Sequence, residues 1–149
     1  MELKELLRNI EVVKFFGVKD RIINDVKNNS REIKLNDLFI AIDGNTIDGH
    51  IYINDAIENG SKSIICETIP EEIHNDITYV VVNNTRKVYS KICSNYFKNP
   101  SKKMYLIGIT GTNGKTTTAT LLYEIFNLYG YKVGLLSTNK ILIDGKEFK

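Results

Sequence analysis

The chain has 149 residues, 42% of them hydrophobic and 26% charged, and its 20 Lys and Arg residues nearly balance its 18 Asp and Glu residues. This composition is typical of a globular protein and excludes a disordered, collagen-like or disulfide-stapled chain. The lysines are spread along the whole sequence, and no apolar run approaches the roughly 18 residues of a membrane helix, so we expect a cytoplasmic protein with no nucleic-acid partner and no membrane contact.

The first hundred residues alternate between helical and strand-like patterns. In chain order, the spacing of apolar residues predicts a helix over 2–10, strands over 21–26 and 37–42, a helix from Ile51 that Gly60 ends, strands over 63–66 and 78–82, and a helix from Thr85 to Phe97. Strands that alternate with helices are typical of a parallel sheet. We therefore expect an α/β domain over residues 1–99.

A polar segment around Pro100 interrupts every pattern, which predicts a linker over residues 98–103. Residues 104–149 predict a strand over 104–110, a glycine-rich loop, a helix to Tyr129 whose buried face is Leu121, Leu122, Ile125 and Phe126, a strand over 132–137 and a hairpin over 141–148. This order opens a parallel α/β domain. About 45 residues seldom bury a core alone, so we expect a piece of a longer domain that packs on the first domain or on a second copy.

The loop Gly111-Thr-Asn-Gly-Lys-Thr-Thr117 carries the clearest chemical signal in the sequence. Glycines let the chain curl so that backbone N–H groups at the start of a helix point at phosphate oxygens, and Gly111 and Gly114 supply that freedom. Lys115 adds a cation that can reach the outer phosphates, and the hydroxyl of Thr116 is a candidate Mg²⁺ ligand. The loop predicts a nucleotide phosphate site.

This loop also permits a plainer interpretation. Ile109 stands where the general phosphate-loop pattern has its first glycine. The alternative is an ordinary helix start that Thr112 or Asn113 caps, with Lys115 as a solvated charge.

The cysteines and histidines predict no metal or redox chemistry. Cys66 and Cys93 match no ligand or redox spacing, and we expect both to be small buried apolar residues. Nothing in their spacing joins His50 and His74 into a metal site, so we expect exposed histidines in turns.

The segment Thr110-Gly-Thr-Asn-Gly-Lys-Thr-Thr117 closely resembles the ATP-binding signature of the Mur ligase family, which extends the peptide of cell-wall precursors, and of the related folylpolyglutamate synthetases. The resemblance implies ATP and Mg²⁺ as cofactors, with Lys115 as the catalytic cation and Thr116 as a metal ligand. The residues that it assigns to the ATP phosphates are Gly111, Thr112, Asn113, Gly114, Lys115, Thr116 and Thr117.

The first hundred residues are similar to the N-terminal domain of the family members that add the third residue of the stem peptide. The likeness rests on the order and spacing of Ser30-Arg31, Asp37–Gly44 and Asp48–Ile57. In the family this domain holds the uridine diphosphate of the substrate, and the residues that match are Ser30, Asn45, Thr46 and Ile47. Without the resemblance, Ser30 and Asn45 could be turn residues alone.

Three positions depart from the usual family pattern. Asn29 stands where Asp is general, Asn36 where Gly is usual, and Ser137-Thr-Asn139 where a Gly-Thr-Ile run is common. An Asn in place of Asp keeps an acceptor but removes the charge, so a turn-stabilising role survives.

The resemblance implies an ATP-dependent, amide-bond-forming ligase of peptidoglycan synthesis. ATP would activate the terminal carboxylate of UDP-N-acetylmuramoyl-L-alanyl-D-glutamate as an acyl phosphate, and the amine of a diamino acid, with meso-diaminopimelate expected, would displace the phosphate. The family's adenine contacts and its domain that selects the amino acid have no counterpart in these residues. We therefore expect a partial enzyme that is inactive by itself.

Three other functions fit part of the sequence. A small P-loop kinase or nucleotide switch would explain the glycine loop alone, and a non-catalytic UDP-sugar-binding module would explain the first hundred residues alone. Within the family, the ligase that adds the final D-alanyl-D-alanine has a related N-terminal region, but Asp48-Gly-His-Ile-Tyr-Ile53 favours the enzyme that acts before it.

Overall fold

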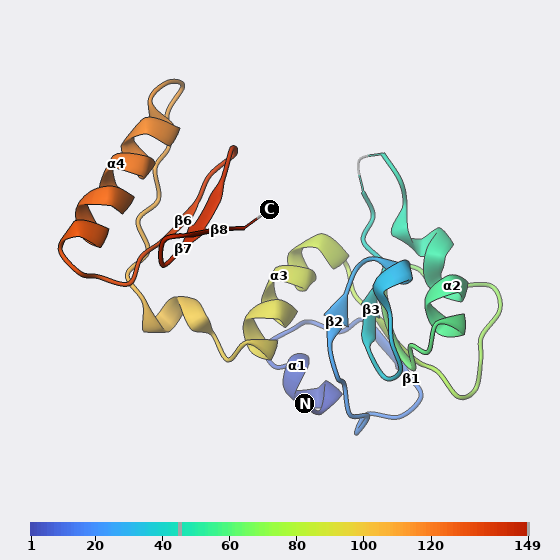
Figure 1. Ribbon diagram of the computed structural model, residues 1–149. Coiled ribbons are helices and arrows are strands. Elements are labelled where there is room, and N and C mark those ends of the chain that lie inside the picture. Colours follow the sequence, from blue (N-terminus) through green and yellow to red (C-terminus); the bar gives the residue numbers. More distant parts are fainter. Residues whose placement is uncertain (45, 149) are drawn as a thin grey trace. The chain divides into compact units, whose positions relative to one another are not determined.

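The structure is a computed structural model that describes residues 1–44 and 46–148. The chain divides into two compact units, Met1–Met104 and Tyr105–Lys149 (Figure 1). Across the described residues, no helix combines the length and the apolar character needed to cross a membrane.

The first unit is built on a five-stranded sheet with the order β1-β5-β4-β3-β2. Its strands are β1 (Lys14–Phe16), β2 (Val26–Lys27), β3 (Leu38–Ile40), β4 (Ser63–Cys66) and β5 (Thr78–Val81). Strands β2 to β5 are parallel, and β1 is an antiparallel edge strand. Every residue of β3, β4 and β5 is buried, as expected for parallel strands that are covered on both faces.

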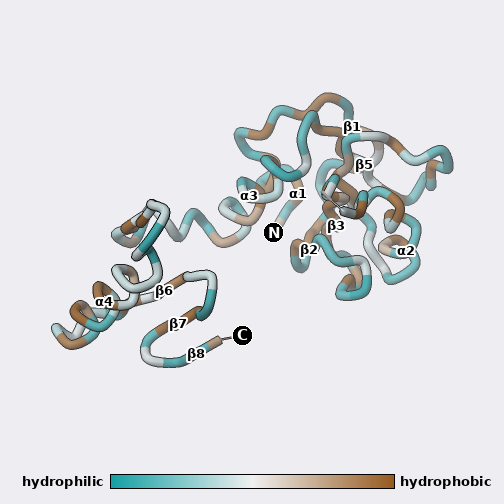
Figure 2. The backbone as a smooth tube through the Cα atoms, turned by 90° about the horizontal axis from the view of Figure 1, so that it is seen from above, coloured by the Kyte–Doolittle hydropathy of each residue, from teal (hydrophilic) through white to brown (hydrophobic). Residues whose placement is uncertain are grey.

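Helices cover both faces of this sheet (Figure 1). Helices α1 (Leu3–Leu6) and α3 (Thr85–Tyr96) pack on one face and α2 (Ile53–Glu58) on the other. Because successive side chains of a strand point to opposite faces, Ile65 joins the cluster under α1 and α3, whereas its neighbour Ile64 joins the cluster under α2. The strands between these layers are hydrophobic over much of their length in Figure 2.

Among the described residues, three short 3-10 helices complete the first unit. They lie at Ser30–Glu32, Gly49–Tyr52 and Pro100–Lys103.

Most predicted elements of the first unit are confirmed. The predicted strand over 63–66 matches β4, and the helix predicted from Thr85 matches α3. The predicted strand over 21–26 is wrong, because only its last residue pairs in the sheet. The predicted helix over 2–10 is shorter than expected, since α1 ends at Leu6 and Asn9 adopts a positive φ of 59°.

Strand β1 has no counterpart in the sequence-based predictions. It has only three residues, and it pairs with β5 in the register Lys14↔Val81 to Phe16↔Tyr79. Such a pairing depends on residues far away in the chain, so no local pattern marks it.

The second unit contains α4 (Lys115–Leu128) and an antiparallel sheet of β6 (Gly134–Leu136), β7 (Ile141–Ile143) and β8 (Lys146–Phe148). The predicted hairpin over 141–148 is confirmed as β7 and β8. The predicted strand over 104–110 is wrong for the described residues, where this segment joins no sheet. A strand needs a neighbour that accepts and donates its hydrogen bonds, and none of the described strands lies beside it.

Helix α4 buries little of its expected apolar face. Leu121 and Ile125 are 53% and 41% exposed, so their prediction as buried residues is wrong. The buried residue is Tyr123, whose hydroxyl accepts a hydrogen bond from the backbone N–H of Gly145 at 2.9 Å. The predicted helix end at Gly130 is confirmed by its φ of 82° and by its N–H bond to Asn127 O.

The side chain of Asn95 connects α3 to the end of α1 and to the residues that follow it, and this contact generates a stability prediction. Its side-chain amide donates to Leu6 O at 2.8 Å and to Arg8 O at 2.9 Å. We expect Asn95→Ala to lower the free energy of unfolding by about 1–3 kcal/mol, because it leaves two carbonyl groups without their donor. Urea unfolding followed by circular dichroism measures this. The exposed Lys91→Ala on the same helix is the control, and equal losses in both variants would contradict the role of Asn95.

Candidate functional site

The loops that follow the parallel strands of the first unit all lie at the carboxyl ends of these strands, which we call the carboxyl edge of the sheet. Strands β2, β3, β4 and β5 run in the same direction, so the segments after Lys27, Ile40, Cys66 and Val81 all leave at their carboxyl ends. In open α/β sheets, ligands bind in the crevice outside these ends. The predicted residues Ser30, Thr46 and Ile47 follow β2 and β3 and therefore belong to this edge.

The loop after β3 is closed at its base by backbone contacts. Asp43 and Asp48 form an isolated antiparallel bridge, and the N–H of Gly49 donates to Ile42 O at 2.9 Å. A Cβ on Gly49 would lie 2.7 Å from that carbonyl oxygen, so only glycine fits there. The closure leaves Thr46 and Ile47 exposed to solvent, while the predicted Asn45 lies outside the described residues.

His50 links this loop to β4, and its expected place in an exposed turn is wrong. The side chain is only 16% exposed. The N–H of Glu67 donates to its Nε2 at 2.8 Å, so Nε2 is an acceptor and the neutral ring carries its proton on Nδ1. Nδ1 lies 2.5 Å from Asp48 Oδ1, which also accepts from the His50 backbone N–H at 2.9 Å. That backbone bond first, and then the ring, hold the pKa of Asp48 below its ordinary value.

Glu67 extends the same network to the start of α3. Its Oε1 accepts from both the N–H and the hydroxyl of Thr85 at 2.8 Å. The Thr85 hydroxyl in turn accepts from the N–H of Asp43 at 3.4 Å, and Arg86 donates to Asp43 O at 3.2 Å. Sequence reasoning missed these residues, because their contacts join three separate segments of the chain.

Ser30 begins the 3-10 helix that follows β2. Asn29 caps this helix, since its Oδ1 accepts from Arg31 N at 3.2 Å, so an acceptor suffices where the family pattern has Asp. Ser30 is only 5% exposed, and its carbonyl accepts from Asn59 Nδ2 at 3.0 Å. The backbone of Ser30 is therefore fixed between β2 and α2.

The glycine loop of the second unit has the backbone that phosphate binding requires. Gly111 and Gly114 adopt φ values of 147° and 77°, and a Cβ on Gly114 would meet nothing within 4 Å. A side chain at this position would therefore find space, and the positive φ is the reason that the position favours glycine. Gly114 is also the N-cap of the 14-residue α4, and no side chain caps this helix in the described structure. The N–H groups of its first turn are thus directed at the loop.

Lys115 folds back over this loop. Its Nζ donates to Gly111 O at 2.5 Å and to Thr112 O at 3.3 Å. Lys115 is exposed to solvent, as the plainer interpretation expects, but the cap by Thr112 or Asn113 that this interpretation also expects is absent from the described structure. An anion bound at the helix start would be favoured both by the N–H groups there and by the positive charge of Lys115.

An open groove of about 410 Å³ runs along α4 beside this loop. Thr116 and Thr117 line it together with Glu124, Asn139 and Lys140, and with Thr120 and Leu121. Sequence reasoning assigned no role to Lys140. Its only sequence signal is its place next to Ser137-Thr-Asn139, the run that departs from the family pattern.

The expected burial is confirmed for Cys66 but not for Cys93, which is only partly buried. Cys66 is fully buried, and burial raises the pKa of its thiol to about 12. Burial also raises the pKa of the half-buried Cys93. Within residues 1–44 and 46–148, no three His, Cys, Asp or Glu side chains form a group that could hold a metal ion.

Comparisons with known families match both units. The model described as "Mur ligase family, catalytic domain" matches residues 22–104, and the "Mur ligase middle domain" matches residues 109–148.

Relatives and solved structures agree with this assignment. The UDP-N-acetylmuramoyl-L-alanyl-D-glutamate–2,6-diaminopimelate ligase of Bacteroides fragilis is 46% identical over 138 residues, which are 93% of this chain and 28% of that protein. A structure of a ligase with the same name covers 96% of this chain and 28% of its own, with a TM-score of 0.67 and 20% identity, and shares the fold. The match to the MurF ligase of Thermotoga maritima, solved with ADP, covers 74% of this chain and 25% of that chain, with a TM-score of 0.53 and 28% identity.

The His50 network generates a stability prediction. His50→Ala should lower the free energy of unfolding by about 1–3 kcal/mol, because the Glu67 N–H and the Asp48 carboxylate each lose a partner. Urea unfolding measures this. The half-buried His74, which forms hydrogen bonds to Tyr79 and Ile77 through its backbone, gives the matched control His74→Ala. A smaller effect at His50 than at His74 would refute the network.

The raised thiol pKa values generate a reactivity prediction. Only the thiolate reacts, and a group with a pKa of about 12 forms almost none at pH 8. In a Cys93→Ser variant, a disulfide reagent at pH 8 should modify Cys66 only after guanidinium unfolding. Release of one equivalent of chromophore from the folded variant within minutes would contradict the burial of Cys66.

Proposed function

The chain belongs to the Mur ligase family, and we propose that its two units form the UDP-substrate-binding part and the ATP-phosphate-binding part of a peptidoglycan ligase. In this proposal residues 1–99 bind UDP-N-acetylmuramoyl-L-alanyl-D-glutamate, and residues 104–149 begin the domain that binds ATP. The observation that carries the proposal is the glycine loop at the start of α4, with Gly111 and Gly114 at positive φ and Lys115 folded over them.

The loop would act on ATP by position and charge. The N–H groups around Asn113 and at the start of α4 would hold the phosphates, and Lys115 would neutralise the charge that develops on the transferred phosphoryl group. Thr116 is partly exposed and lines the groove beside the loop, and its hydroxyl would supply one ligand of Mg²⁺. Mg²⁺ commonly completes its shell with phosphate oxygens and water, and would supply charge neutralisation when bound.

The carboxyl edge of the first unit would hold the uridine diphosphate. Uracil presents one donor between two acceptors, which short hydroxyl side chains and loop backbone can satisfy. Ser30, Thr46 and Ile47 belong to this edge, and Asn45 is proposed with them from the family pattern. The network of His50, Asp48 and Glu67 would hold the loop in place.

The proposed reaction joins a diamino acid to the activated D-glutamyl carboxylate, with release of phosphate. The relatives at 40–46% identity are diaminopimelate ligases by name, which favours meso-diaminopimelate over D-alanyl-D-alanine as the added group. Because ATP and UDP-linked sugars are cytoplasmic compounds, the proposed reaction is cytoplasmic.

The chain spans only 28–31% of the curated relatives that it matches. We therefore expect these 149 residues alone to bind nucleotides without completing the ligation. Self-association of the second unit, whose Leu106 and Ile107 are exposed, also stays a prediction.

Isothermal titration of the chain with UDP and with ATP–Mg²⁺ tests the proposal. Both should bind. Lys115→Ala should weaken ATP at least about tenfold, because a charge-assisted contact to phosphate is lost, and should leave UDP binding unchanged. Ser30→Ala should weaken UDP binding and should leave ATP binding unchanged.

The control is Lys132→Ala, which removes an exposed lysine outside the loop. Binding of UDP alone would favour a non-catalytic UDP-sugar module, and binding of ATP alone would favour a nucleotide switch. An unchanged ATP affinity in Lys115→Ala would refute the assigned phosphate site.

A further inference from the structure

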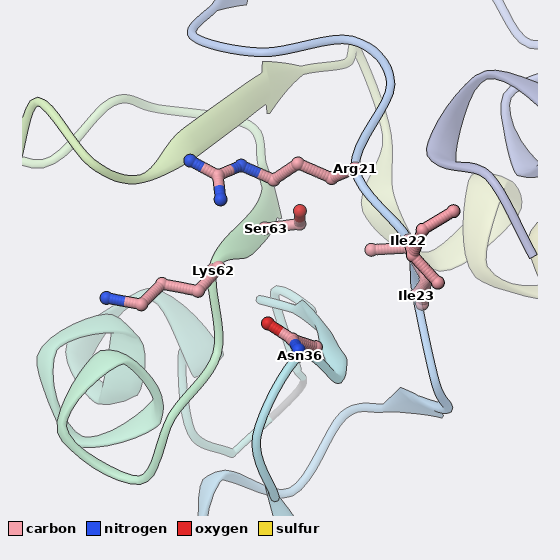
Figure 3. Close-up of a pocket in the computed structure, with 6 residues that line it drawn as sticks. All are labelled: Arg21, Ile22, Ile23, Asn36, Lys62 and Ser63. Carbon is pink, nitrogen blue, oxygen red and sulfur yellow. The ribbon is translucent and has the colours of Figure 1, made fainter.

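A second pocket of the first unit lies at the opposite edge of the sheet, at the amino ends of the parallel strands. Its volume is about 180 Å³. Three of its residues precede β2, one precedes β3, and two stand at the start of β4. They are Arg21, Ile22, Ile23, Asn36, Lys62 and Ser63 (Figure 3).

Ser63 creates the space for this pocket. In the sheet register it lies between Leu38 of β3 and Thr78 of β5, on the face that Ile65 shares with α1 and α3. Because a serine side chain is much smaller than a leucine side chain, it leaves space between the sheet and the segment Arg21–Ile23. Figure 3 shows its hydroxyl between the side chains of Arg21 and Asn36.

The Ser63 hydroxyl is buried without a partner. The residue is 0% exposed, and among the described residues its Oγ is the buried side-chain atom that forms no hydrogen bond. Such a group destabilises the folded chain unless something satisfies it. The neighbouring Ser61, also fully buried, shows the contrast, because its hydroxyl donates to Asp37 O at 2.8 Å.

Two cationic residues also line this pocket. The Nε of Arg21 donates to Thr78 Oγ1 at 2.7 Å and another guanidinium nitrogen donates to Asp76 O. These bonds fix the guanidinium and use two of its five N–H donors. Lys62 lines the same pocket, and its Nζ lies 2.5 Å from Asp76 Oδ2.

From this arrangement we infer that the pocket binds a small oxyanion of the phosphate class. Ser63 Oγ would donate one hydrogen bond from below, Arg21 and Lys62 would supply positive charge, and the Asn36 amide would donate from the side. All four groups can donate hydrogen bonds, and an oxyanion accepts such bonds. A cation would be repelled by the positive charge of Arg21 and Lys62. The pocket is distinct from the proposed uridine diphosphate site, because it lies at the amino ends of the parallel strands and that site lies at their carboxyl ends.

The carboxylate of Asp76 would compete with this anion for the ammonium group of Lys62. Its carboxylate is 65% exposed and pairs with a Lys62 side chain that is 34% exposed, so the pair is weak and easily exchanged. An anion in the pocket would take Lys62 from Asp76. Removal of Asp76 should therefore strengthen anion binding, whereas removal of Lys62 should weaken it.

The test is a titration of the ¹⁵N-labelled chain with inorganic phosphate, followed residue by residue, which separates this pocket from the glycine loop. Phosphate should shift the amide signals of Asn36 and Ser63, and sodium chloride at equal ionic strength should not. Ser63→Ala should weaken the affinity about tenfold, Lys62→Gln several-fold, and Asp76→Asn should strengthen it. Lys91→Gln removes the same charge elsewhere and should change nothing.

Thermal melting gives an independent readout. In phosphate-free buffer Ser63→Ala should melt at the same or a higher temperature than the wild type, because it removes an unpartnered hydroxyl. Phosphate should then raise the melting temperature of the wild type and not that of Ser63→Ala. Shifts confined to the glycine loop, equal shifts with chloride, tighter binding of acetate than of phosphate, or a lower melting temperature of Ser63→Ala without phosphate would each overturn the inference.

Discussion

The first unit depends on burial of three neighbouring strands on both of their faces. Strands β3, β4 and β5 expose no residue, so the chain must supply helices for each side and return every strand to the same edge. Each buried Ile, Val or Phe contributes about 1.5–3 kcal/mol. This requirement explains why α1 and α3 lie on one face and α2 on the other. It also brings four connecting segments together at one edge, although they are distant in the chain.

That edge is ordered by polar contacts which the sheet alone does not provide. The N–H of Glu67 finds its acceptor in the ring of His50, and the Glu67 carboxylate accepts from Thr85 at the start of α3. Because an unpaired buried polar group is costly, each contact restricts the next. The exposed tip at Thr46 and Ile47 is thereby held on a fixed base, as a loop that recognises a ligand requires.

In the second unit, the candidate site depends on local contacts and not on contacts between distant segments. Its glycine loop is formed by contiguous residues, and the contacts of Lys115 reach only three and four positions back. Such a site needs few tertiary contacts, whereas the apolar face of α4 does need them: Leu121 and Leu128 are 53% and 86% exposed. The chain matches 28% of the length of the Bacteroides fragilis relative.

The sequence by itself determined the strands β4 and β5, helix α3, the hairpin and the glycine loop, because apolar periodicity and glycine conformation act within a few residues. It also marked Ser30 and the loop after β3 through a family pattern, although those assignments stay proposals. Only the tertiary structure decided that Lys14–Phe16 is a strand, that residues 104–110 pair with none of the described strands, that His50 accepts from Glu67, and that the Ser63 hydroxyl is buried without a described partner. These outcomes depend on hydrogen-bond partners and packing neighbours that are supplied by distant segments, and no local spacing records them.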